Sequence, residues 1–290
     1  MTPDDKLAAI LAAVQVDPGN RGLARDPADN LFTATAGDFQ AACRVLAKRP
    51  VANVLSGFYI PTAEPPAFET DGPLGAVFLI RALQQVRGYG DQYPCEVPVY
   101  RAIMAGLAAV KHPGQFSPHA AFPTHLICIE RAGPAADGNY YTMRGRDIGP
   151  HLDPYPKSSF ARLRPHDVTI GIGDGGNEIG MGKVPHDTVV KNIPNGDLVH
   201  CRVPTDHLIV AGVSNWGAYA LAAGVFVLRG VKPPADLFDP DRERAILEVM
   251  VREGPLVDGV TGKQTATVDG LTWDEYARPL LRIREILEAP

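Results

Sequence analysis

The chain contains 290 residues, 45% hydrophobic and 21% charged, a composition typical of globular proteins and not of disordered ones. A net charge of −5, without any basic stretch, argues against nucleic acid as a partner. The four cysteines are widely spaced and fit no zinc pattern, so we interpret them as buried apolar residues of a protein from a reducing compartment. Since the first residues also lack the features of a signal peptide, we expect a cytoplasmic protein.

Amphipathic helices are expected at both ends of the chain. Residues 3–15 place apolar side chains on one face, and residues 38–48 repeat the pattern. Near the other end, residues 239–253 show the same periodicity, and Thr272 with Glu275 forms a capping box in front of a last helix.

Short apolar runs alternate with helical patterns in the middle of the chain. This order predicts an α/β fold with a mainly parallel, doubly wound sheet and helices on both faces. Each run ends in a loop rich in Gly, Asp, Glu, Asn and Ser, and such loops meet at the carboxyl edge of a parallel sheet, where ligands bind. The four runs, expected to be neighbours in the middle of the sheet, are residues 51–55, 126–129, 168–172 and 208–213.

The pattern shows no linker, so we expect one domain over residues 1–290. Residues 208–228 carry no charge and are long enough to span a bilayer, but a Ser-Asn-Trp-Gly centre divides them. We interpret them as a buried strand, a turn and a buried helix, and expect no membrane association. Within the domain we expect N-terminal helices in 1–50, the strand–loop–helix core in 51–230 and C-terminal helices in 231–290, with a loop or hairpin at 255–271.

A glycine-rich loop, GIGDGGNEIGMGK at residues 171–183, follows the third run. It lacks the spacing of a Walker A loop, and although it matches the Rossmann glycine pattern, Asp174 would place a negative charge where a pyrophosphate needs neutral backbone. Asp174 and Glu178 suit a hard cation or an ammonium group instead. A purely structural turn in which Asp174 caps a following helix stays open as an alternative.

Two further polar segments follow the first two runs. Glu69 and Asp71 lie just before an expected helix at residues 73–87, which Asp71 could simply cap. Glu130 and Arg131 end the second run and lead into a polar loop, in which Arg131 could alternatively form a surface ion pair.

The fourth polar segment contains Ser214 and Asn215 at the start of an expected helix. They could cap that helix or present N–H and hydroxyl donors to a carboxylate.

At these segments the sequence resembles the D-glutamate cyclase family. The resemblance covers about residues 16–270 and is closest to the C-terminal domain of the two-domain eukaryotic members and to its stand-alone bacterial relatives. Ser56 stands where the family pattern leads us to expect Thr. The strings that carry the resemblance are DPGNRG (17–22), ETDGP (69–73), ERAGPAADGNYY (130–141), GDGGNEIGMGK (173–183) and AGVSNWGAY (211–219).

The resemblance implies an enzyme, a hydro-lyase, that converts D-glutamate to 5-oxo-D-proline with loss of water. That reaction needs a base for the amine and an acid or metal at the γ-carboxylate. We expect Asp174, Glu178 and Asp71 to be catalytic, and Asp174 with Glu178 to bind Mg²⁺ or Mn²⁺, unless two carboxylates share a proton instead. Nicotinamide, flavin and pyridoxal phosphate are not expected. The residues expected to bind the substrate are Arg21, Glu69, Glu130, Arg131, Asn139, Asn177, Ser214 and Asn215.

Two other functions remain open from the residues alone. A non-catalytic domain that binds a small amino acid or a metal would keep the same polar loops without needing a base. A phosphate-ester or nucleotide enzyme would use the glycine-rich loop for its phosphate. For all three functions the expected partner is a small molecule, and for the cyclase it is an amino dicarboxylate substrate. Whether the chain forms a homo-oligomer stays open.

Overall fold

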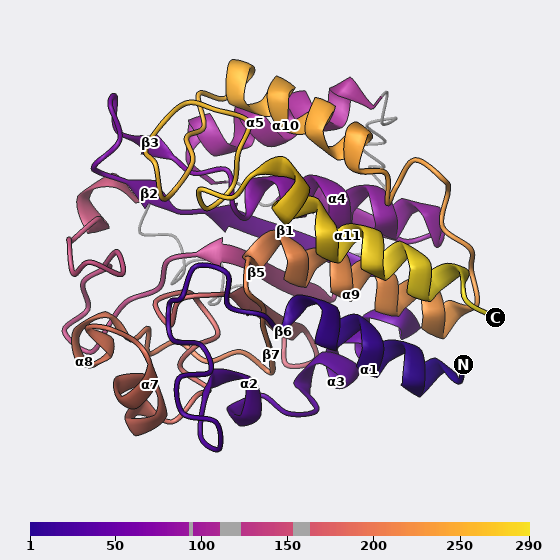
Figure 1. Cartoon of the computed structure of the whole chain (residues 1–290), viewed down its shortest axis with the longest axis horizontal. Coiled ribbons are helices and arrows are strands. Elements are labelled where there is room, and N and C mark those ends of the chain that lie inside the picture. Colours follow the sequence, from indigo (N-terminus) through magenta and orange to yellow (C-terminus); the bar gives the residue numbers. More distant parts are fainter. Residues whose placement is uncertain (93–94, 111–122, 153–162) are drawn as a thin grey trace.

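A five-stranded parallel sheet forms the centre of the computed structural model, which describes residues 1–92, 95–110, 123–152 and 163–290 (Figure 1). Its strand order is β4-β1-β5-β6-β7, and each neighbouring pair runs parallel. This confirms the predicted α/β class. The strands are β1 Val51–Gly57, β4 Tyr89–Gln92, β5 His125–Arg131, β6 Val168–Gly173 and β7 His207–Val210.

All four apolar runs form adjacent strands, but the sheet has one more strand than the sequence predicts. The additional strand, β4, pairs with β1 and forms one edge of the sheet. Strand β7, which was expected in the middle, forms the other edge. Strand β4 was not predicted, because its sequence, Tyr-Gly-Asp-Gln, is not an apolar run. Gly90 lets this strand pass close to helix α4, since a Cβ there would lie 3.1 Å from the Cα of Ile80.

The two faces of the sheet are covered differently. Alternate residues of a strand point to opposite faces. Ile127 of β5 and Ile172 of β6 pack into the main hydrophobic core with residues of the long helices. Leu208 and Val210 of β7 point the other way, into a smaller cluster that includes Leu31 and Val189 of the short helix α7.

The predicted helices occur close to their expected bounds. Capping boxes start α1 at Thr2 and α11 at Thr272, as the sequence indicates. The long helices are α1 Pro3–Val14, α3 Asp38–Lys48, α4 Pro73–Gln85, α5 Val97–Ala109, α9 Ser214–Arg229, α10 Pro240–Glu253 and α11 Trp273–Glu288. The short elements are α2 Leu31–Ala34, α7 His186–Asn192, α8 Gly196–Val199, the 3-10 turn Gly149–His151 and the hairpin β2 Tyr59–Ile60 with β3 Ala67–Phe68.

The uncharged segment 208–228 is divided as expected. Strand β7 ends at Val210, and α9 begins at Ser214. In the described part of the chain, no helix is long and apolar enough to cross a membrane. Of the cysteines, Cys43, Cys128 and Cys201 are buried free thiols, and Cys95 is half-buried.

Candidate active site

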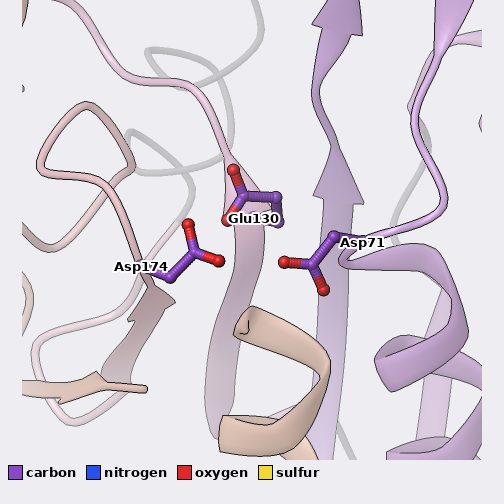
Figure 2. Close-up of side chains that lie close together, drawn as sticks. All are labelled: Asp71, Glu130 and Asp174. Atoms are coloured by element: carbon purple, nitrogen blue, oxygen red, sulfur yellow. The ribbon is translucent and has the colours of Figure 1, made fainter. Parts of the chain in front are cut away.

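Three buried carboxylates meet at the carboxyl edge of the sheet. Asp71 precedes α4, Glu130 is the second-to-last residue of strand β5, and Asp174 follows β6, so they come from three separate segments (Figure 2). One oxygen from each carboxylate lies within 4.8 Å of the others. The convergence follows from the parallel topology, which gathers the ends of all strands at one edge.

A β-bulge directs Glu130 into this cluster. The pairing of β1 with β5 shifts register between Ser56 and Gly57, which leaves Glu130 without a partner on β1. Its φ of 44° lies in the left-handed region, which non-glycine residues rarely adopt. Bulges next to functional sites commonly re-aim one side chain, and here the re-aimed side chain is an acid.

Asp71 and Asn215 cap each other's helices. The carboxylate of Asp71 accepts hydrogen bonds from the N–H groups of Ser214 (2.9 Å) and Asn215 (2.8 Å), at the start of α9. The Asn215 Oδ1 in turn accepts from the N–H groups of Gly72 and Gly75, at the start of α4. From the sequence, it stayed open whether each residue caps its own helix; in the structure, each caps the other's helix. This exchange fixes the Asp71 carboxylate between the two helix ends.

The glycine-rich loop is organised around Glu178 and leads into no adjacent helix. The two Glu178 oxygens accept hydrogen bonds from the N–H groups of Asp174 and Gly176, both at 2.8 Å. Glu178 is completely buried, and these two hydrogen bonds fix the loop that carries Asp174. Its carboxylate lies outside the three-acid cluster of Figure 2.

Arg21 connects the cluster to the far end of the chain. Its guanidinium forms ion pairs with Asp174 (3.1 Å) and Asp269 (2.9 Å) and donates a hydrogen bond to the carbonyl of Gly212. The N-terminal loop that carries Arg21 is shaped by Asp17, whose carboxylate accepts hydrogen bonds from three backbone N–H groups, among them that of Arg21 itself.

A cavity of about 290 Å³ opens beside these groups. Four carboxylates, those of Glu69, Glu130, Asp174 and Asp269, lie in its wall with Arg21. Arg144 and Arg146, both exposed, line it as well. The cavity therefore combines a buried acidic wall with an exposed basic one.

Burial shifts Glu69, Glu130 and Asp71 toward their protonated forms. Burial, together with the charges of Asp269 and Asp71, raises the pKa of Glu69 well above its usual value. Burial and the charge of Asp174 raise the pKa of Glu130 in the same direction. For Asp71, burial and the charge of Asp269 outweigh its hydrogen bonds from the start of α9 and raise the pKa to about 7.

Comparison with known proteins places the chain in a family. Residues 10–284 match the family model described as "D-glutamate cyclase-like, C-terminal". The chain belongs to this family. The human D-glutamate cyclase of mitochondria is 34% identical over 253 residues, which cover 79% of this chain and 40% of that protein. The chain thus spans less than half the length of this curated relative.

Solved structures add little to this assignment of the D-glutamate cyclase-like domain. The RecJ protein of Thermus thermophilus, solved in complex with Mn²⁺, aligns with the whole chain and with 42% of its own at 13% sequence identity. Its TM-score of 0.34 is too low for any inference.

Several residues predicted to bind substrate have other partners in this D-glutamate cyclase-like domain. Arg131 is buried and forms a bidentate pair with Glu96, at 2.6 and 2.8 Å. Asn139 lies on an exposed loop, where its amide group contacts Asp137 and Tyr141.

Three other predicted binding residues lie at or behind the cavity. Asn177 lines it and donates a hydrogen bond to the carbonyl of Tyr141. Ser214 donates its hydroxyl to Glu130 (2.6 Å), and Asn215 caps α4 as described above. The donors of Ser214 and Asn215 therefore bind carboxylate or backbone groups of the protein itself.

Four residues of the site were missed by sequence reasoning. Asp258 and Asp269 each precede a glycine in the expected loop at 255–271, and these two Asp-Gly pairs were the available signal. Asp258 folds this loop by accepting backbone hydrogen bonds, and Asp269 pairs with Arg21. Arg144 and Arg146 flank a glycine in a tight turn just beyond the motif that ends at Tyr141.

Gly72 is required between Asp71 and α4. Its φ is 90°, and a Cβ there would lie 2.5 Å from the Ser56 Oγ and 2.7 Å from the Glu130 Cβ. We expect Gly72→Ala to lower the free energy of unfolding by more than ~1 kcal/mol, because alanine is strained at this φ and crowds Glu130. Urea denaturation measures this loss. Gly138→Ala is the matched control, since Gly138 also has positive φ (87°) but no atom within 4 Å of the added Cβ. Equal losses in both variants would show that crowding at Gly72 contributes nothing.

Proposed function

We propose that this chain is an enzyme that cyclises D-glutamate to 5-oxo-D-proline and releases water. The proposal rests on the family and on the name of its human relative. The observation that carries it is the cavity with one acidic and one basic wall. An amino dicarboxylate has one ammonium and two carboxylate groups, and so presents both signs of charge to such a cavity.

The basic wall would bind the substrate's carboxylates. Arg144 and Arg146 lie on either side of Gly145 in a turn closed by hydrogen bonds between Thr142 and Arg146 and between Gly145 and Thr142. Guanidinium groups bind carboxylates with two parallel hydrogen bonds, which fixes orientation as well as position. The cavity volume of about 290 Å³ is at the small end of ligand sites, as a substrate of this size requires.

Glu69 is the best-placed base for the substrate's amine. It is 5% exposed and lines the cavity. No hydrogen bond or ion pair to its carboxylate occurs among the residues that the structure describes. Burial raises the pKa of Glu69 and so brings that pKa closer to the pKa of the substrate's ammonium group, which favours proton transfer between the two groups.

The reaction balances with Glu69 as a proton shuttle. Glu69 takes a proton from the ammonium group, and the free amine attacks the γ-carboxyl carbon, so that a C–N bond forms. Both protons lost by nitrogen pass to one γ-carboxylate oxygen, which leaves as water when its C–O bond breaks. A substrate held in a folded conformation makes this attack intramolecular, which can replace up to ~7–11 kcal/mol of the barrier.

A phosphate-binding function is less well supported. An anion site in the glycine-rich loop would need free N–H groups, and those of Asp174 and Gly176 already donate to Glu178. A non-catalytic binding domain would fit the same cavity, and only turnover separates it from an enzyme.

The test is to incubate the purified chain with D- or L-glutamate, with and without Mg²⁺ or Mn²⁺, and to measure 5-oxoproline by chiral chromatography. We expect D-glutamate to yield 5-oxo-D-proline and L-glutamate to yield no product. Replacing Arg144 or Arg146 with Met should raise KM by about 10-fold or more, since each loses a charged hydrogen bond to a carboxylate. Binding of D-glutamate without any product would favour the non-catalytic alternative.

A further inference from the structure

The three-acid cluster of Asp71, Glu130 and Asp174 retains unused acceptor capacity. Among the described residues, the Asp71 Oδ2 accepts a hydrogen bond from the N–H of Ser214 alone, and the Glu130 Oε2 accepts one from the hydroxyl of Ser214 alone. A carboxylate has about four acceptor positions. Each acid therefore has lone pairs left that can bind a further ligand, and the three side chains point toward one another in Figure 2.

Among the described residues, the carboxylates that line the cavity outnumber its arginines. Among the described residues of the wall, the half-buried Arg21 forms ion pairs with Asp174 and Asp269, whereas the other two arginines, Arg144 and Arg146, are exposed. Glu69 is more than nine-tenths buried, lines the same cavity and has no hydrogen-bond or ion-pair partner among the described residues. Burying a carboxylate without a counter-charge is energetically unfavourable, so this arrangement favours the binding of a further positive group.

We infer that Asp71, Glu130 and Asp174 bind one hard divalent cation, Mg²⁺ or Mn²⁺. The three ligands are all carboxylate oxygens, and neither histidine nor cysteine belongs to the cluster, which selects hard cations over zinc. The sequence placed this cation at Asp174 and Glu178. Glu178 is not a ligand, because both of its oxygens accept backbone hydrogen bonds. The ligands beside Asp174 are instead Asp71 and Glu130, which come from other segments.

The cation would also remove an obstacle to the proposed function. A substrate with two carboxylates is repelled by an acidic wall, and a bound divalent ion cancels that repulsion and polarises the γ-carboxylate. This consequence depends on the proposed function, whereas the binding site depends only on the geometry.

The test uses the full chain, stripped of metal with a chelator and titrated with MnCl₂ at pH 8. Isothermal titration calorimetry and the electron paramagnetic resonance signal of bound Mn²⁺ measure binding directly. We expect one saturable site per chain, and at least ~10-fold weaker binding by Glu130→Gln and by Asp174→Asn. Glu248→Gln makes the same chemical change on the exposed face of α10 and should bind like the wild type. Circular dichroism checks that each variant is folded.

Two results would overturn the inference. One is the absence of saturable Mn²⁺ binding to the folded wild-type chain, as expected if two of the acids share a proton instead. The other is binding that is equally strong in both cluster variants. Metal binding without turnover would leave this site standing and remove the proposed function, and turnover by metal-free protein would do the reverse.

Discussion

The substitution Glu69→Gln is expected to lower kcat for D-glutamate about 10²–10⁴-fold, the range typical for loss of a general base. The amide keeps the shape of the side chain but cannot take the proton of the ammonium group. KM should change much less, because Arg144 and Arg146, the proposed carboxylate-binding residues of the cavity, are unaltered. Steady-state kinetics with chromatographic detection of 5-oxoproline measures both constants.

The pH profile provides a second readout for Glu69. Because burial raises its pKa, the rate should fall as the pH drops through that raised value, at a higher pH than an ordinary glutamate would show. This acid limb should be absent from the residual activity of Glu69→Gln. Glu248→Gln on the exposed face of α10 should keep both the rate and the limb. A Glu69→Gln enzyme with wild-type kcat would exclude Glu69 as the base.

The substitution Arg81→Met should lower the free energy of unfolding by about 3–5 kcal/mol, the usual effect of removing one partner from a buried ion pair. Arg81 on α4 binds Glu243 on α10, and both side chains are buried. Without Arg81, the Glu243 carboxylate remains in the core with no counter-charge at its bonded oxygen. Urea denaturation followed by circular dichroism measures the loss.

The loss from Arg81→Met should also depend on pH. Burial raises the pKa of Glu243 to about 7 even beside Arg81, and without Arg81 the shift should be larger. A carboxyl group with a raised pKa in the folded state costs stability once the pH exceeds its unfolded value of about 4.3, so the loss should be greater at pH 8 than at pH 5.

The double variant Arg81→Met, Glu243→Leu is the control for this pair. It replaces both charges with apolar side chains, and it should recover most of the stability because no charge is left buried. If the double variant is as unstable as Arg81→Met alone, the loss comes from packing and not from the unpaired carboxylate.

The sequence by itself determined the strands and the acids that follow them. Residues 51–55, 126–129, 168–172 and 208–213 predict buried parallel strands, because a strand covered on both faces must be apolar throughout. Parallel strands in turn place the residues after them at one edge, so that Asp71, Glu130 and Asp174 could be expected close together before any coordinates were known.

Only the tertiary structure decided which polar groups remain available to a ligand. Asp174 and Glu178 look equivalent in the glycine-rich loop, yet both carboxylate oxygens of Glu178 already accept hydrogen bonds from N–H groups of that loop. Arg131 looks like a carboxylate binder, yet Glu96, 35 residues away, binds it. The number of hydrogen bonds that a side chain has left depends on neighbours from distant segments, and local sequence patterns carry no information about them.

The contributions from distant loops show the same limit. Asp269 and Arg21 meet across most of the length of the chain, and Arg144 reaches the cavity from a turn outside the predicted motif. None of these positions belongs to an apolar period, because each is a polar side chain in a loop. Their place in the site follows from how the loops pack over the carboxyl edge of the sheet, which is fixed by burial and long-range contacts and not by local propensity.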